Sequence, residues 1–318
     1  MATPPISEVP EVEQQYLVQA AIVGGLTASA DELWPILDPT DLAGTVPTIQ
    51  RGLVALVDRF SQASISTSAD YYEDLRSLHI AGRYSAPIVD ATPAGRVRAI
   101  LNAIASPNMA RANALRDDLF LGQIATDLVH GSLTAAQSLV ADAGSDQIFT
   151  ALHGDDRAQG WARITKPGAC YFCRMLASRG AVYRTEHSGS FRAHTPKDGR
   201  GGYCGCTVEP LFGRYYEPTA QARADIDTWN RVARGHGKDS IELFRREVEG
   251  RTDGPRRPRR IKAGRKGKPA EVVQSLSFDS LTATQLQRQL EIIEPLKDSG
   301  WRTKQLDRLR SRLAELGA

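Results

Sequence analysis

The sequence has little sulfur, no long apolar run and no strong excess of either charge. Its 318 residues include four cysteines and three methionines, and the formal net charge is +3. The longest apolar stretch, around Leu17 to Leu26, is interrupted by Gln19 and two glycines and is too short to cross a bilayer. We therefore expect no membrane partner.

The N-terminus also lacks the basic and apolar segments of a secretory signal. We expect residues 1–10 to form a flexible arm and the protein to be made in a reducing cytoplasm, where metal-bound cysteines are favoured over disulfides. Charged residues make up 24% of the chain and apolar residues 41%, which is typical of a globular protein rather than a disordered one. The length predicts two domains, or one domain with extensions.

Residues 11–156 predict a helical N-terminal domain. Apolar side chains recur at helical spacing between Val46 and Phe60. Ser106-Pro107 resembles an N-cap followed by proline at the first helical position, so we expect a helix to begin there. We expect Gly131 to end that helix.

Residues 157–249 have a different character, with all the cysteines, many glycines and short β-prone pieces. They predict a small loop-rich β module at about 160–212, followed by two short helices that Gly235-His236-Gly237 separates. Residues 250–269 predict a basic linker, because proline, glycine, arginine and lysine dominate them. Residues 270–318 predict a C-terminal helical segment with an apolar stripe at Leu306, Leu309, Leu313 and Leu316. The predicted fold class is α+β: mainly α, with a small β module stapled by a metal site.

The four cysteines lie within 37 residues, as Cys170-x-x-Cys173 and Cys204-x-Cys206. Two close pairs separated by a Gly-rich loop suit one tetrahedral ion, because thiolates are soft ligands and the loop lets the pairs converge. We predict a structural Zn²⁺ at these residues, since four protein ligands leave no position for a substrate. His194 is a possible substitute for one thiolate. Cross-paired disulfides and unmodified thiols are the alternatives.

Zinc bound by four thiolates carries a net charge of −2, and a nearby cation would offset it. The basic residues closest in sequence to the cysteine pairs are Lys166, Arg174 and Arg192. We also expect hydrophobic burial alone to be too weak to hold so loop-rich a module together, so that the metal acts as its staple.

The ordered motifs of this region resemble the cysteine-rich core of the phage Mu F-like minor head proteins, in the form found in tailed phages of actinobacteria. The runs that carry the resemblance are GWARIT at 160–165, CYFCRMLASRG at 170–180 and CGCTVEP at 204–210. Many members of that family place a histidine two residues before the last Cys-x-Cys, where this chain has Gly202. Participation of a histidine in the site is therefore less favoured than the four cysteines.

The resemblance implies a minor capsid protein that acts in head morphogenesis inside the virion, at the portal vertex, and in some members leaves with the DNA at ejection. The implied partners are the portal protein and the major capsid or scaffold proteins. Some members are labelled capsid maturation protease, so cleavage of head proteins is an alternative function. Enzymatic activity is suggested by that family label alone and is less favoured, because none of the six histidines lies beside a serine in a recognisable elbow such as Gly-x-Ser-x-Gly.

The basic linker suggests a second kind of partner. Residues 251–268 hold nine basic side chains against one acid, so this segment is +8 and the rest of the chain −5. Mobile cations neutralise phosphates without reading base sequence, so we expect contact with packaged phage DNA. A nonspecific DNA-binding zinc protein is a further alternative function. The predicted DNA-binding residues are Arg256, Arg257, Arg259, Arg260, Lys262, Arg265, Lys266 and Lys268.

Overall fold

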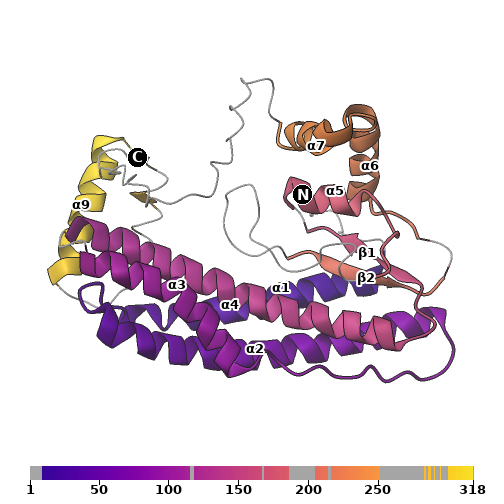
Figure 1. The fold of residues 1–318 in the computed structure, drawn as a ribbon, viewed down its shortest axis with the longest axis horizontal. Coiled ribbons are helices and arrows are strands. Elements are labelled where there is room, and N and C mark those ends of the chain that lie inside the picture. The colour runs from indigo at the N-terminus through magenta and orange to yellow at the C-terminus, as the bar shows by residue number, and fades with distance from the viewer. Residues whose placement is uncertain are drawn as a thin grey trace, which may run out of the picture.

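The computed structural model describes residues 9–114, 118–166, 168–185, 205–213, 216–250 and 300–317, with a few single residues between 283 and 294. In these ranges the chain is mainly helical with one two-stranded sheet, which confirms a mainly α fold with a small β part. Long helices lie along one another, and the sheet and short helices sit over one end of them (Figure 1). No helix in the described ranges is long and apolar enough to cross a membrane.

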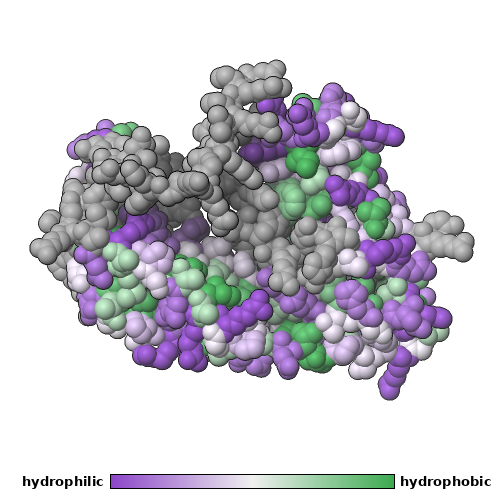
Figure 2. All heavy atoms as spheres, viewed as in Figure 1, coloured by the Kyte–Doolittle hydropathy of each residue, from purple (hydrophilic) through white to green (hydrophobic). Residues whose placement is uncertain are grey.

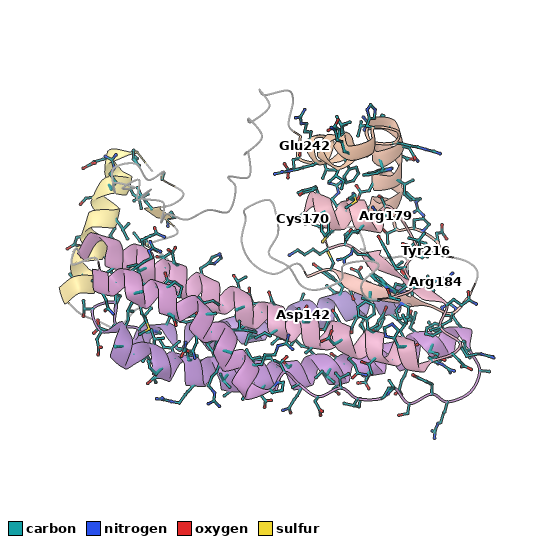
Figure 3. The ribbon with its side chains drawn as sticks, in the orientation of Figure 1. Asp142, Cys170, Arg179, Arg184, Tyr216 and Glu242 are labelled. Carbon is teal, nitrogen blue, oxygen red and sulfur yellow. The ribbon has the colours of Figure 1, made fainter. Side chains whose placement is uncertain are left out.

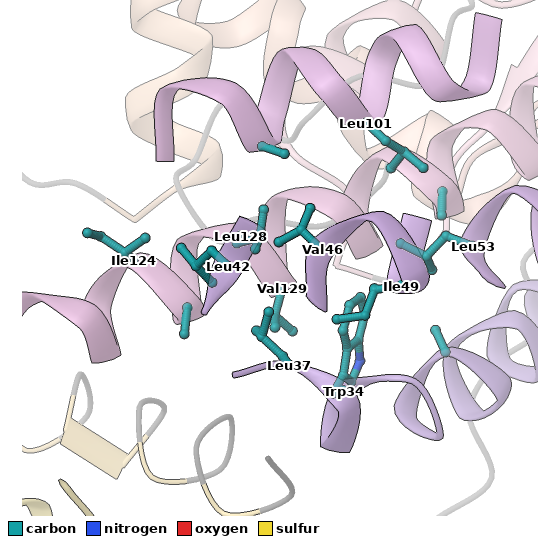
Figure 4. Packing of buried hydrophobic residues seen from close by; sticks show 14 of the residues in the cluster. Trp34, Leu37, Leu42, Val46, Ile49, Leu53, Leu101, Ile124, Leu128 and Val129 are labelled. Atoms are coloured by element: carbon teal, nitrogen blue, oxygen red, sulfur yellow. The ribbon is translucent and has the colours of Figure 1, made fainter. Parts of the chain in front are cut away.

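The long helices pack into a bundle through a first apolar core. They are α1 (Pro10–Asp31), α2 (Leu42–His79), α3 (Ala94–Ala114) and α4 (Asp118–Gly154), with a 3₁₀ turn η1 (Trp34–Ile36) after the first. The N-terminus of α2 is capped, because the Asp41 carboxylate accepts a hydrogen bond from the Gly44 amide at 2.9 Å. Figure 4 shows core side chains that include Trp34, Leu37, Leu42, Val46, Ile49, Leu53, Leu101, Ile124, Leu128 and Val129.

The apolar spacing between Val46 and Phe60 correctly predicted the buried face of α2. Ile49, Leu53 and Val57 are buried in the first core, and Phe60 packs against it. The 3.6-residue period places these side chains on one stripe, so the helix can bury them together against α1, α3 and α4.

The predicted helix start at Ser106-Pro107 is wrong. Pro107 lies inside α3, which begins further upstream. The carbonyl of Pro93 accepts hydrogen bonds from the amides of Arg96 (2.8 Å) and Val97 (3.1 Å), so Pro93 precedes the first turn instead. A proline inside a helix removes one backbone hydrogen bond, at a cost of about 3 kcal/mol that packing must offset.

The predicted helix end at Gly131 is also wrong, because α4 continues through Gly131 and through Gly144 to Gly154. Both internal glycines lie where another helix comes close. A Cβ atom on Gly131 would lie 3.0 Å from a methyl carbon of Ile104, and one on Gly144 would lie 2.4 Å from Ser64 Oγ. These glycines therefore permit close helix packing and do not stop the helix.

A buried ion pair marks the end of the bundle, where the chain leaves α4. Arg76 Nε of α2 donates to Asp155 Oδ2 at 2.6 Å, and both side chains are nearly excluded from solvent. Tyr72 Oη donates to the same oxygen at 3.3 Å. The pair fixes the C-terminal end of α2 against the residue that follows α4.

The small sheet shares a second apolar core with the bundle. Strands β1 (Gly160–Ile164) and β2 (Thr207–Leu211) pair in antiparallel fashion, and α5 (Tyr171–Ala177) lies between them in sequence. Trp161 is fully buried and stacks on Tyr183, with ring centroids 4.6 Å apart. The second core joins side chains of α1, α2 and α4 to those of the sheet and α5. Hydrophobic burial therefore helps to hold the module, contrary to the expectation from its loop-rich sequence.

Two short helices complete the module, and a further helix lies at the other end of the bundle (Figure 1). The helices α6 (Ala220–Val232) and α7 (Ser240–Val248) are separated as predicted, with a 3₁₀ turn η3 (Gly237–Asp239) between them. In α9 (Gly300–Glu315) the predicted stripe is buried against the first core at Leu306, Leu309 and Leu313. Leu316 lies beyond the helix and is 44% exposed, so its assignment to the stripe is wrong.

Apolar side chains on the surface are scattered. The face in Figure 2 is largely hydrophilic, with small separate groups of hydrophobic residues. In the part of the chain that the structure describes, the exposed large hydrophobic side chains come from different elements: Leu17, Ile36, Leu78, Ile88, Val182, Ile241 and Leu316.

Candidate metal centre

The antiparallel ladder brings the two cysteine motifs towards one place. Its last pair joins Ile164, at the end of β1, to Thr207, at the start of β2. Cys170-x-x-Cys173 follows β1 after a short turn, and Cys206 directly precedes β2. Because paired strand ends lie side by side, segments more than 30 residues apart in sequence leave and enter the sheet at the same edge.

A tight turn and a helix start shape the first motif. Gly168 has a φ of +69°, a left-handed conformation that suits glycine, and the Ala169 amide donates to the Lys166 carbonyl at 3.1 Å. Cys170 is the N-cap residue of α5 and Cys173 lies in its first turn. Both thiol side chains are buried, and Cys173 is fully so.

The structure brings three of the four predicted ligands together. Cys170 and Cys173 form a small buried cluster with Ala169, and Cys206 packs against it. In Figure 3, Cys170 lies at the start of α5, on the side of the module that faces α4. Cys204 and His194 lie outside the described residues. Within the described part of the chain, no group of three or more histidine, cysteine or carboxylate side chains has metal-site geometry.

A cation that contacts the cluster is Arg163, which sequence proximity to the cysteines did not single out. Its Nη1 atom lies 3.7 Å from Cys173 Sγ, and the side chain is 2% exposed. Arg174, one of the cations predicted to offset the cluster, instead pairs with Asp225 of α6 through Nε, at 3.0 and 3.2 Å. The sequence did hold one signal for Arg163: a charged residue inside a strand of otherwise apolar and small side chains.

A small cavity of mixed polar and apolar lining adjoins Cys206, on the side that faces the bundle. Its volume is about 110 Å³, and α1, α2, α4 and the residues around the second motif line it. The lining includes Gln15, Ser68 and Lys166. Gln15 Nε2 donates to Ser68 Oγ at 2.9 Å, so this wall is held by a buried hydrogen bond. Cys206 lines this cavity and is half-buried, whereas Cys173 is fully buried.

A buried carboxyl group lies on β2, close to this edge. Glu209 is 9% exposed, and burial raises the pKa of its carboxyl group from 4.5 to about 7. The pKa of Tyr71 is raised by its own burial and, secondly, by the charge of Glu209. The hydroxyl group of Tyr71 donates to the Val208 carbonyl at 3.0 Å. This tyrosine anchors β2 to α2.

Two of the described histidines stack on phenylalanine rings. His79 stacks on Phe212, with ring centroids 6.2 Å apart, and His153 stacks on Phe149 at 6.4 Å. The predicted DNA-binding residues between 256 and 268 lie outside the described residues.

In a comparison with known protein families, residues 8–232 match the VG15 protein family, which is a family of phage proteins. The chain belongs to the VG15 family. The match covers the whole helical bundle, the cysteine cluster and α6. No curated protein and no solved structure matches the chain. VG15 membership supports the phage origin that the resemblance implied. It does not specify the Mu F-like minor head proteins.

The VG15 match ends before the second core does. The match begins just before α1 and ends at the last residue of α6, so it takes in the bundle and the cysteine cluster together. The second core continues past this limit to Phe244 and Val248 of α7.

Proposed function

We propose that the chain is a minor head protein of a tailed bacteriophage, bound at the portal vertex and acting in head morphogenesis. The observation that carries this proposal is the VG15 match, which covers the bundle and the cysteine module together. The sequence motifs around the cysteines resemble those of the Mu F-like minor head proteins, and they therefore favour a head protein among phage proteins. The exposed side of the long bundle supplies the surface for the portal and for capsid or scaffold partners.

A structural zinc ion is part of the proposal. Cys170, Cys173 and Cys206 gather at one sheet edge with a buried arginine beside them, and Cys204, two residues before Cys206, supplies the fourth thiolate. The bound ion supplies a cross-link between the two cysteine motifs. The chain itself holds the ligands in place, through the α5 N-terminus on one side and the start of β2 on the other.

The basic segment gives the protein a second contact inside a filled head. Its local charge of +8 suits phosphates, and DNA is the most abundant polyanion in that compartment. This contact adds to the role at the portal and requires no sequence recognition.

Counting proteins in purified particles tests the head assignment. Quantitative mass spectrometry is expected to find the chain in mature virions at a few copies per portal, and affinity purification of the chain is expected to recover the portal protein. Absence from particles, together with failure to bind the portal, would refute the proposal. Co-expression with the coat protein tests the protease alternative, because a shortened coat protein would support it.

Elemental analysis tests the zinc site separately. Protein purified under reducing conditions is expected to contain one zinc per chain, and Cys170→Ser or Cys206→Ser is expected to lose it. A folded wild-type protein without zinc would contradict this part of the proposal and leave the head assignment intact.

A further inference from the structure

The two apolar cores of the bundle meet at a layer of buried polar side chains. On α2 the last buried residue of the first core is Val57, and the first buried residue of the second core is Ala69. Between them Ser61, Ser64 and Ser68 are fully buried. The inner face of α2 therefore turns polar over the stretch that joins the two cores.

The same change occurs on α1, in the opposite direction along the chain. Val12 belongs to the second core and Val23 to the first. Gln15 and Gln19 lie between them, and both donate to Ser68 Oγ, at 2.9 and 3.1 Å. Side-chain hydrogen bonds thus join α1 to α2 at the level where the cores meet.

The third long helix, α4, crosses the same level at Gly144. Val140 belongs to the first core and Ile148 to the second. A Cβ atom on Gly144 would lie 2.4 Å from Ser64 Oγ and 3.1 Å from Gln19 Oε1, so α4 packs directly against these polar groups. All three helices therefore pass from one core to the other at one polar layer, formed by Gln15, Gln19, Ser61, Ser64, Ser68 and Gly144.

Parting the helices at this layer costs less free energy than opening either core. Polar groups that separate exchange their hydrogen bonds for bonds to water, whereas separated apolar side chains have no such replacement. Ser61 Oγ is buried and has no hydrogen-bond partner among the described residues, so it gains one when water enters. The cavity beside Cys206 is large enough for water and reaches the layer, where Gln15, Gln19 and Ser68 line it.

The helices also carry weak helix formers at this level. Residues 61–68 of α2 read SQASISTS, with four serines and one threonine. Thr67 Oγ1 donates to the Ala63 carbonyl at 3.0 Å, so a side chain competes there with the backbone amides. In α4 the layer falls on a glycine, the poorest helix former after proline.

We propose that the polar layer is a hinge between two cooperative units of the bundle. One unit is built on the first core and contains α3 and α9, and the other is built on the second core and contains the sheet and α5. Each unit opens locally while the other stays folded, because α1, α2 and α4 give way at the layer. This device is independent of a metal at the cysteines and of the role in the phage head.

Two leucines of α2 test whether the units are separate. Leu53 lies in the first core and Leu75 in the second, and both are almost fully buried. Hydrogen exchange of the full chain, followed by mass spectrometry, reports the first unit at the amides of α3 and the second at those of β1. Leu53→Ala is expected to speed exchange in α3 by about 30-fold or more and to leave β1 unchanged. Leu75→Ala is expected to do the reverse.

A second pair of variants tests whether the polar layer is the hinge. Gln19→Met with Ser64→Ala replaces its central hydrogen bonds by apolar contact and should couple the units, so Leu53→Ala should then speed exchange in both. The matched control lies beside the first core, where Gln137 Nε2 donates to Thr27 Oγ1 at 2.9 Å. Thr27→Val with Gln137→Met removes this bond between α4 and α1 away from the layer, so the effect of Leu53→Ala should stay confined to α3.

Each outcome decides the proposal. Confinement of faster exchange to one unit, together with its loss in Gln19→Met/Ser64→Ala alone, supports the hinge. If both leucine variants speed exchange equally in α3 and β1, the bundle is one cooperative unit and the proposal is wrong. If confinement persists in Gln19→Met/Ser64→Ala as it does in the control, the polar layer is not the hinge. Circular dichroism checks the fold of each variant, and Leu53→Val and Leu75→Val carry the comparison if the alanine variants do not fold.

Discussion

Replacing Gly144 with alanine tests the close approach of α4 to α2. Alanine is normally the better helix residue, by about 1 kcal/mol. At this position, however, the new Cβ atom would lie 2.4 Å from Ser64 Oγ and 2.9 Å from Ser68 Oγ. Real Cβ atoms do not tolerate such distances, so either a serine must rotate or the helices must separate.

The magnitude follows from what the displaced serine loses. Ser64 Oγ donates to Gln19 Oε1 at 2.6 Å, and the hydroxyl group is fully buried. Breaking that bond costs about 1–3 kcal/mol, and overpacking a tight core costs a similar amount. Set against the gain in helix propensity, Gly144→Ala is expected to destabilise the protein by about 2–4 kcal/mol.

Gly24 provides the matched control. It lies inside α1, and a Cβ atom there would meet nothing within 4 Å. Gly24→Ala is therefore expected to stabilise the protein by about 0.5–1 kcal/mol, because only the propensity term remains. The same substitution should thus act in opposite directions at two interior helix positions.

Urea unfolding followed by circular dichroism measures both changes, and a double-mutant cycle identifies the contact. Ser64→Ala removes the atom nearest to the new methyl group, so Gly144→Ala should cost less in that background, with a coupling of about 1–2 kcal/mol. An increase in stability for Gly144→Ala like that of Gly24→Ala would refute the close packing of α2 and α4 at this point.

Three further predictions concern charge. Burial raises the pKa of Glu209 to about 7 in the folded protein, so its contribution to stability is fully present below pH 4.5 and is lost as the pH rises through 7. Glu209→Gln should therefore reduce the change of the urea unfolding midpoint with pH across this window. Glu217→Gln, at an exposed site, should leave that pH dependence unchanged. Asp155→Asn leaves the buried guanidinium of Arg76 without its carboxylate, which should lower the free energy of unfolding by roughly 3–5 kcal/mol in the same assay. Deletion of residues 251–268 should abolish binding to duplex DNA, whose affinity should fall with salt by a slope of about −0.9 for each phosphate neutralised; binding that survives the deletion would place the DNA contact elsewhere.

Periodicity in the sequence was enough to predict the helical body, because it records which face of a helix is buried. The run from Val46 to Phe60 and the stripe at Leu306 to Leu313 both pack into the first core as expected. Local start and stop signals were less informative. Pro107 and Gly131 lie inside helices, because tertiary packing offsets the local cost of proline and because Gly131 lies where α3 approaches.

The candidate site could be predicted in part. Cysteine spacing predicted that the two motifs would meet, and the ladder brings Cys206 to Cys170 and Cys173. Arg163 could not be found by proximity to the cysteines, because it reaches Cys173 through the fold of the sheet and α5. Arg174 is closer in sequence, but its helix directs it to Asp225.

The packing of the module changes what a metal ion would contribute. The loop-rich sequence predicted a module that zinc alone holds together, yet Trp161, Tyr183 and Phe244 are buried in a core that continues into the bundle. That core fixes the sheet and helices, and the ion pair of Arg174 with Asp225 docks α6 on α5. A metal at the cysteines would therefore act at the sheet edge, where it joins the start of α5 to the start of β2. Its effect on stability should come from that cross-link, while the bundle and the second core persist without it.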